Sequence, residues 1–502
     1  MTAAGARAPG LRYGEPEGRW VLLATVLGSG MAFLDATVVS IALPAIGEDL
    51  GSSAAGLQWV VNGYTLTLAA FILLGGSLGD RFGRKRVFLA GVVLFAVAST
   101  LCGLAPNTGT LVAARAVQGL GGALLAPGSL AILQSSFAAE DRTRAIGAWS
   151  GLSGMAGAIG PLLGGWLVEV ANWRLVFLIN VPVALVVVLV TLRHVPESSD
   201  PAAARRLDVP GTVLAAVGLG GLTYGLTAWQ EGQRGVVAAT LALGVVALGA
   251  FLAVERRSPA PMLPLHLFRS TTFSAVNAMT FLVYAALGGV FFFVVVQLQV
   301  VSGFPPLEAG LALLPVTLLM LVLSARVGAL SNRIGPRLPM ALGPLLCALA
   351  LVGLSRIGAG ADYLTDVLPP VALLGLGLSL TVAPLTATVL AAVEDRYAGV
   401  ASGINNAVAR TGGLLAVAVL PLVSGVGAEL TDPATLAPAY RTSMLICAAL
   451  MAVGGLLALA AVPSSYEQVR PPTERGAAES PCRVHCAVGA PPLQPGGEPS
   501  RP

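Results

Sequence analysis

Asp35 is the residue of this sequence best placed to do chemistry, because it lies deep inside an apolar stretch that runs from Phe33 to Pro44. The chain has 25 Asp and Glu residues, and all the others fall in loops, tails or the ends of apolar stretches. A carboxylate inside a membrane helix is costly and normally faces the bundle interior or a wet cavity. Desolvation favours its neutral form and a nearby cation its charged form. We therefore expect Asp35 to bind and release a proton; the alternative is a packed acid capped by hydroxyls such as that of Thr37.

Arg115 is the second charged residue with an unusual position. It lies about one turn into another apolar stretch, in the segment from Leu111 to Gly122. A guanidinium there needs an acceptor, and Asp35 is the obvious acidic candidate, directly or through water. The alternative is an arginine that snorkels to the outer interface.

The composition defines what kind of protein must position these two residues. Of 502 residues, 55% are hydrophobic and only 11% are charged, whereas soluble domains carry about 25% charged residues. The sequence is therefore typical of an all-α polytopic membrane protein. Its net charge of +4 gives no support to nucleic-acid binding.

Fourteen apolar runs have the length of about 20 residues that spans a bilayer as a helix. Alternate loops and the two tails hold 22 of the 29 Lys and Arg residues, which predicts that both termini face the cytoplasm. The runs are 20–43, 57–78, 87–105, 110–134, 146–168, 175–192, 210–229, 235–254, 273–300, 309–330, 338–357, 367–393, 398–423 and 441–462.

Internal repeats divide these runs. The sequence GSLGDRFG at 76–83 recurs as GALSNRIG at 328–335, and EDR at 140–142 recurs at 394–396. Each of the first six spans thus matches the span eight places later, so the fourteen spans divide into groups of six, two and six. The two groups of six are expected to form parallel bundles with a site between them. The expected parts are a cytoplasmic tail (1–19), a first bundle (20–192), a linker (193–209), an inserted helix pair (210–254), a second linker (255–272), a second bundle (273–463) and a disordered cytoplasmic tail (464–502).

The repeated loop also carries charges with fixed spacing. Its basic residues alone would be explained by a positive-inside anchor, but the acid, the glycines and the recurrence would not. We expect a charged latch between helix ends that forms and breaks between conformations. Its members are Gly79, Asp80, Arg81, Gly83 and Arg84, with Asn332 and Arg333 in the repeat.

The fifth run contains small residues every three or four positions, which let another helix approach closely. Pro161 removes a backbone hydrogen bond, so this helix is expected to bend at a tightly packed interface. Ordinary helix packing would also explain the glycines. The residues concerned are Gly157, Gly160, Pro161 and Gly164.

The sequence lacks the motifs that several energy sources and cofactors require. No phosphate-binding Gly-x-x-x-x-Gly-Lys-[Ser/Thr] sequence is present, so ATP-driven export by this chain is not expected. The three histidines lie outside the apolar runs, which leaves a haem or metal centre without its usual ligands. We expect no metal and no cofactor, with the proton gradient as the energy source.

Together these segments resemble the major facilitator superfamily, and within it the fourteen-span drug:proton antiporters. The resemblance lies in residues 34–39, 76–86, 115–122, 154–165, 173–182 and 261–268. It implies a monomeric, multi-pass transporter of the bacterial plasma membrane, not an enzyme. Such a transporter exports amphipathic drugs or antibiotics by alternating access, with antibiotic resistance as the result. Some relatives carry a further acid in the tenth span, whereas residues 311–330 have none. Proton coupling then depends on Asp35 alone, and efficient export of dications is not expected.

A cavity between the bundles would be mostly apolar, with a few polar groups that orient a small amphipathic substrate. Each such residue could instead form an interhelical hydrogen bond. Two alternative functions remain. One is proton-coupled uptake of a metabolite, and the other is that of a non-transporting receptor or lipid scramblase with the same fold. The candidate cavity residues are Asn62, Tyr64, Gln118, Asn277, Tyr284, Gln297, Asn405, Asn406 and Arg410.

Overall fold

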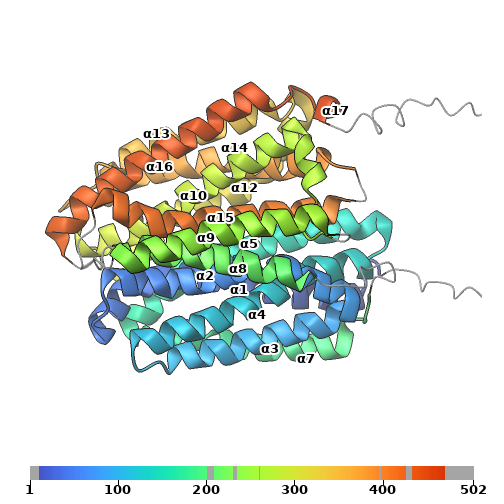
Figure 1. Ribbon diagram of the computed structural model, residues 1–502, viewed down its shortest axis with the longest axis horizontal. Helices are drawn as coiled ribbons and strands as arrows, with labels where there is room; N and C mark the ends of the chain where they lie inside the picture. Colours follow the sequence, from blue (N-terminus) through green and yellow to red (C-terminus); the bar gives the residue numbers. More distant parts are fainter. Residues whose placement is uncertain are drawn as a thin grey trace, which may run out of the picture.

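The computed structural model describes residues 11–199, 208–229, 234–258, 261–394, 397–425 and 432–469. Over these ranges the chain is almost entirely helical (Figure 1), and the predicted all-α membrane architecture is confirmed. Thirteen helices of the described chain are long and apolar enough to cross a membrane. The fifth predicted run lies in a further helix of 32 residues, Ala139–Val170, which is not among the thirteen. The number of fourteen spans therefore stays a prediction.

The helices fall into three groups in chain order. The first bundle contains α1 (Pro16–Leu50), α2 (Ala54–Phe82), α3 (Arg84–Gly103), α4 (Thr108–Ser136), α5 (Ala139–Val170), α6 (Leu175–Leu178) and α7 (Asn180–His194). The inserted pair is α8 (Val209–Ala228) and α9 (Arg234–Arg257). After the short η2 (Leu265–Arg269), the second bundle contains α10 (Thr271–Val300), α11 (Pro306–Ala312), α12 (Leu314–Ile334), α13 (Arg337–Leu354), η3 (Tyr363–Val367), α14 (Leu368–Ala391), α15 (Ala398–Ser424), α16 (Pro433–Ala461) and α17 (Tyr466–Val469).

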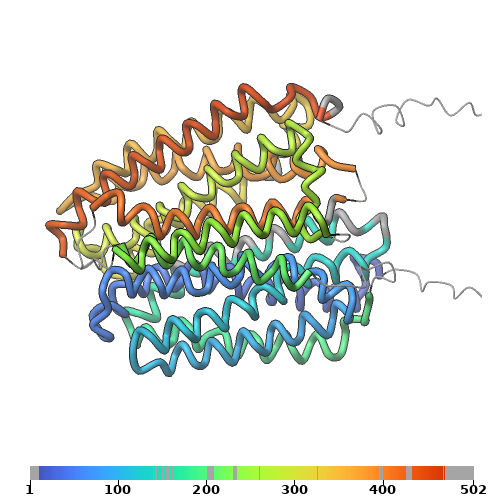
Figure 2. Tube along the Cα trace, viewed as in Figure 1, coloured from blue at the N-terminus to red at the C-terminus, as the bar shows by residue number. Residues whose placement is uncertain are grey.

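The two bundles lie side by side, the first below and the second above in Figure 1, and α8 and α9 run along the seam between them. The chain trace in Figure 2 shows the same division by colour. The inserted pair packs against both bundles, because Leu219 of α8 contacts Leu66 and Ala69 of α2 together with Leu414 of α15. The tight turns before α3 and α13 repeat as well: Gly83 has a φ of 108° and Gly335 a φ of 84°.

The bundles are joined at the end opposite to the start of α1, which we call the far end. There the Gln299 side chain of α10 donates to the carbonyl of Ile41 at 3.1 Å, and the Leu307 amide of α11 donates to Glu169 of α5 at 3.4 Å. A Cβ at Gly165 would lie 2.5 Å from the Leu307 Cα, so only glycine allows this approach. One apolar core includes residues from both bundles at this end.

Close helix contact inside the first bundle gives a first prediction. A Cβ at Gly75 of α2 would lie 2.1 Å from the Ala123 carbonyl oxygen of α4, and backbone atoms cannot move aside as a flexible side chain can. Gly75→Ala should therefore destabilise the protein by about 1–3 kcal/mol. Gly76→Ala is the matched control, because a Cβ there meets only Pro127 at 3.7 Å. Thermal unfolding in detergent measures both, and equal melting temperatures would contradict the close approach.

Candidate proton-coupling site

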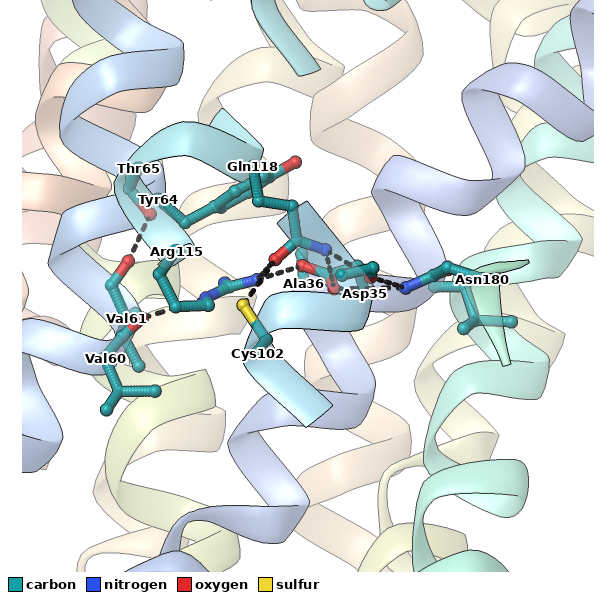
Figure 3. Close-up of polar contacts among 12 residues, drawn as sticks. Asp35, Ala36, Val60, Val61, Tyr64, Thr65, Cys102, Arg115, Gln118 and Asn180 are labelled. Atoms are coloured by element: carbon teal, nitrogen blue, oxygen red, sulfur yellow. Dashed lines mark hydrogen bonds and ion pairs between the residues drawn. The ribbon is translucent and has the colours of Figure 1, made fainter. Parts of the chain in front are cut away.

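Asp35 lies near the middle of α1, fully buried, and is bonded to α4 (Figure 3). The Arg115 Nη1 donates to its Oδ2 at 2.5 Å, and the Gln118 Nε2 donates to its Oδ1 at 2.8 Å. Arg115 and Gln118 are three residues apart and so project from the same face of α4. Two α4 side chains therefore bond both oxygens of one carboxylate. Asp35 and Arg115 are therefore in direct contact, which is one of the two arrangements expected from the sequence.

The guanidinium of Arg115 is held from several sides and is only 1% exposed. Its Nε donates to the Val60 carbonyl of α2 at 3.0 Å, and its Nη1 also donates to the Gln118 Oε1 at 2.7 Å. The ring of Tyr64 lies 4.4 Å from the guanidinium carbon, which is a cation–π distance. Arg115 thus points into the bundle and does not snorkel to an interface.

A second layer of polar side chains holds the carboxylate from the opposite side. The Asn180 side chain of α7 donates to the Asp35 Oδ1 at 3.4 Å and to the Ser99 hydroxyl of α3 at 2.9 Å. Gln118 donates to the same hydroxyl at 2.9 Å, and the Cys102 thiol lies 3.6 Å from its Oε1. No role for Ser99, Cys102 or Asn180 follows from the sequence. The only indication of a role was that each is a polar residue inside an apolar run.

The chemistry of this site is that of a buried ion pair surrounded by neutral hydrogen-bonding groups. The carboxylate accepts from one cationic donor and two amide donors. Thr37 does not cap it, because the Thr37 hydroxyl donates to the carbonyls of Phe33 and Leu34. Asp35 has no exposed surface in this conformation. Exchange of a proton with water therefore requires the helices around it to move.

The fifth predicted span connects this site to the second bundle. A Cβ at Gly160 of α5 would lie 2.0 Å from the Thr37 Oγ1, and one at Gly164 would lie 3.0 Å from a Val38 methyl group. The next residue, Gly165, is the one that contacts α11 of the second bundle. Helix α5 therefore packs on α1 within a turn of Asp35 and on the other bundle beyond it. Gly157 and the ring of Pro161 lie outside the part of α5 whose side-chain surroundings are described.

The residues of the predicted latch in the first bundle lie around the turn between α2 and α3. The Arg84 side chain donates to Asp80 at 2.8 Å, across the turn that contains Gly83. Arg81 lies over the ring of the neighbouring Phe82, and Gly79 accepts the backbone bond of Gly83 that ends α2. The latch thus includes an ion pair between two helix ends.

Glu197, which follows α7, is a latch contact that the sequence analysis missed. Its Oε1 accepts from the Lys85 amide at 3.1 Å, and its Oε2 lies 3.6 Å from the Arg86 Nε. A carboxylate is favoured at the first turn of α3, where the amides of a helix start point outward. In the repeat, Asn332 and Arg333 are exposed, and their side chains make no hydrogen bond or ion pair with any residue that the structure describes.

The candidate cavity residues fall into two sets. Most form hydrogen bonds within one bundle, which is the alternative role given above for each of them. Gln118 belongs to the Asp35 site. Asn405 donates to Asn277 at 3.3 Å and to Thr280 at 2.7 Å. Gln297 donates to the Ile357 carbonyl at 2.9 Å, and Asn406 donates to the Ser402 carbonyl at 3.1 Å.

The other set lies at the seam. Asn62 of α2 is fully buried and its amide has no hydrogen-bond partner in the described chain. The same holds for Gln58, one turn earlier, which the sequence analysis did not select. Tyr64 has a buried hydroxyl without a described partner, while its ring packs against Arg115 and Phe95 of the first bundle. Arg410 of α15 lies within electrostatic range of Tyr64 and Tyr284. Asn62 lies one turn before Leu66, which belongs to one apolar cluster with Leu414 of α15, so its amide lies on the face of α2 that meets α15.

The fold defines a class, that of two-bundle membrane transporters, and comparison with known proteins agrees. A model of the Major Facilitator Superfamily matches residues 25–417, so the chain belongs to this superfamily. A bacterial homologue of the human lysosomal transporter Spinster, solved in an inward-facing and unoccupied conformation, has a TM-score of 0.65 and 19% identity. That match covers 91% of this chain and 99% of the other, and shows the fold alone.

Three relatives share much more sequence. The "Tetracenomycin C resistance and export protein" of Streptomyces glaucescens is 39% identical, with 82% of this chain and 76% of that protein covered. The "Cephamycin export protein CmcT" of Amycolatopsis lactamdurans is 38% identical, with 84% and 88% covered. The "Puromycin resistance protein pur8" of Streptomyces alboniger is 38% identical, with 82% of each covered. The predicted resemblance is confirmed: this chain is a membrane transporter with homologues named for antibiotic export and resistance.

Proposed function

We propose that this protein is a proton-driven antiporter that exports amphipathic drugs or antibiotics across the bacterial plasma membrane by alternating access. The observation that carries the proposal is the buried Asp35–Arg115 pair, with a 2.5 Å contact at the centre of the first bundle. An intramembrane ion pair of this kind is typical of proton relays in transporters. The names of the relatives support the export of antibiotics.

Protonation of Asp35 supplies the switch. A neutral carboxyl no longer attracts Arg115 as an ion, so the bonds that hold α1 against α4 weaken. Because α1 packs on α5 through Gly160 and Gly164, and α5 packs on α11, a shift of α1 reaches the contacts that close the far end. Proton binding and substrate binding then favour different arrangements of the two bundles.

The latch acts at the other end of the bundles. The Asp80–Arg84 pair and Glu197 tie α2, α3 and the segment after α7 together. In the proposed cycle these contacts, with Asn332 and Arg333 in the repeat, form and break as the bundles rock. Both termini face the cytoplasm, the protein works as a monomer, and neither ATP nor a metal or cofactor takes part.

Everted membrane vesicles test the proposal. Respiration makes their interior acidic, and an antiporter that carries substrate inward must carry protons outward. Adding puromycin or tetracenomycin C should therefore dissipate the pH gradient, read from an acridine dye, in vesicles that contain the protein but not in vesicles without it. A gradient that stays intact while the compound binds the protein would contradict drug antiport. Compound movement that is independent of the gradient would instead fit a scramblase or passive carrier.

A further inference from the structure

Arg410 is a charged residue that the mechanism above does not use. It lies near the middle of α15 and is half-buried. Asn406, one turn before it, is exposed, and Leu414, one turn after it, contacts Leu66 and Ala69 of α2. Residues four apart lie on one face of a helix, so this face of α15 is the one turned towards the first bundle. Arg410 therefore lies at the seam between the bundles.

This guanidinium has no partner of opposite charge. It makes no hydrogen bond or ion pair with any described residue. The full sequence has one acid deep inside an apolar run, Asp35, and that carboxylate is already bonded to Arg115. A cation at this depth normally pairs with an anion or borders a wet cavity. Within the described chain, the guanidinium of Arg410 therefore has no counter-charge.

The groups around Arg410 are neutral hydrogen-bonding groups. It lies within electrostatic range of Tyr64, which Asp35 reaches as well, and of Tyr284. The buried hydroxyl of Tyr64 has no described partner, and neither has the buried amide of Asn62. Asn62 and Leu66 are one turn apart on α2, and Leu66 contacts Leu414. Arg410 and the unpaired amide of Asn62 thus lie on the faces of α15 and α2 that meet at the seam.

We infer that Arg410 binds an anionic group of the exported compound, such as a carboxylate or an ionised phenol or enol, and that the transporter prefers acidic amphipathic compounds to cationic ones. This inference rests on the proposed function and specifies its substrate class. The guanidinium fork can bond both oxygens of a carboxylate. Tyr64, Tyr284 and Asn62 then orient the neutral part of the compound.

The charge balance of the transport cycle agrees with an anionic substrate. With Asp35 as the one coupling acid, one proton enters in each cycle. Exporting a dication for one proton moves net positive charge outward, against an inside-negative membrane potential. Exporting a monoanion for one proton moves net positive charge inward, so that both the potential and the pH gradient drive export.

A matched pair of probes tests the inference without any gradient. Anthraquinone-2-carboxylate and anthraquinone-2-carboxamide share one ring system and differ in charge. We expect the full-length protein in lipid nanodiscs to bind the carboxylate at least tenfold more tightly than the carboxamide, as measured by quenching of tryptophan fluorescence. Arg410→Gln should abolish this preference and leave carboxamide binding unchanged, whereas Arg410→Lys should keep most of it.

Arg326→Gln is the control, because it also removes an arginine from an apolar span of the second bundle, at an exposed position on α12. It should retain the preference. Loss of the preference in Arg326→Gln, its persistence in Arg410→Gln, or failure of the wild type to bind the carboxylate would each overturn the inference. The proposed function fails separately: a protein that prefers the anion but never dissipates a proton gradient would refute antiport and leave the assignment of Arg410 intact.

Discussion

Asp35→Asn is expected to abolish gradient-driven export. With one proton exchanged for each neutral substrate molecule, a gradient of one pH unit sustains about a tenfold concentration ratio, and the variant should sustain none. Asparagine keeps the size of the side chain and can still bond Arg115 and Gln118, but it cannot take up and release a proton. Substrate binding without a gradient should therefore survive. The measurement is accumulation of substrate in proteoliposomes under an imposed pH gradient.

Asp49→Asn is the matched control for this prediction. Asp49 lies near the end of the same helix, where it accepts from the Arg174 side chain at 2.7 Å and from the Trp173 indole at 3.0 Å. Its neutralisation should leave accumulation at the wild-type level. Gradient-driven accumulation by Asp35→Asn at the wild-type rate would remove Asp35 from the mechanism, however well the helices are placed.

Arg115→Ala is expected to destabilise the protein strongly, and more so in alkaline solution than in acid. Removing one partner of a buried ion pair leaves the other charge uncompensated, at a cost of about 3–5 kcal/mol. Protonation of Asp35 removes that charge, so the melting temperature of the variant should recover as the pH falls from about 8 to about 5.5. Stability that is present at low pH and lost at high pH is the sign expected for an acid whose neutral form is favoured by folding.

The double variant Asp35→Asn/Arg115→Ala separates the ion pair from the packing of the arginine. It has no carboxylate left to titrate, so its melting temperature should change with pH no more than that of Asp35→Asn alone. It should also be more stable than Arg115→Ala at alkaline pH. If the two variants melt together at every pH, the cost comes from the lost packing against Tyr64 and the lost bond to Val60, and the charge of Asp35 plays no part.

The latch shows how far a motif can be interpreted without a structure. The recurrence of residues 76–83 at 328–335 predicts two matching turns, and Gly83 and Gly335 do adopt positive φ values. The Asp80–Arg84 pair is local, four residues apart, and so lies within reach of sequence reasoning. Glu197 is not local, because it follows α7 and meets α3 only after four further helices have packed.

Much of this protein follows from the sequence alone. An apolar content of 55% with 11% charge requires membrane-spanning helices, and the repeat divides them into two bundles. Asp35 and Arg115 stand out because a charge inside a membrane is costly. Each needs a partner of opposite charge, and this need predicts that they pair with each other. These inferences rest on composition and energy, which do not depend on which helices are neighbours.

The tertiary structure alone decided which polar groups meet. Gln118, Asn277 and Gln297 belong to the same residue types as Asn62, and all lie in apolar runs. Yet the first three bond within a bundle and Asn62 has no described partner. Ser99 and Asn180 join the Asp35 site from helices far along the chain. A membrane helix is apolar on every side, so its sequence gives little indication of which face meets which neighbour; that depends on the packing of all the helices together.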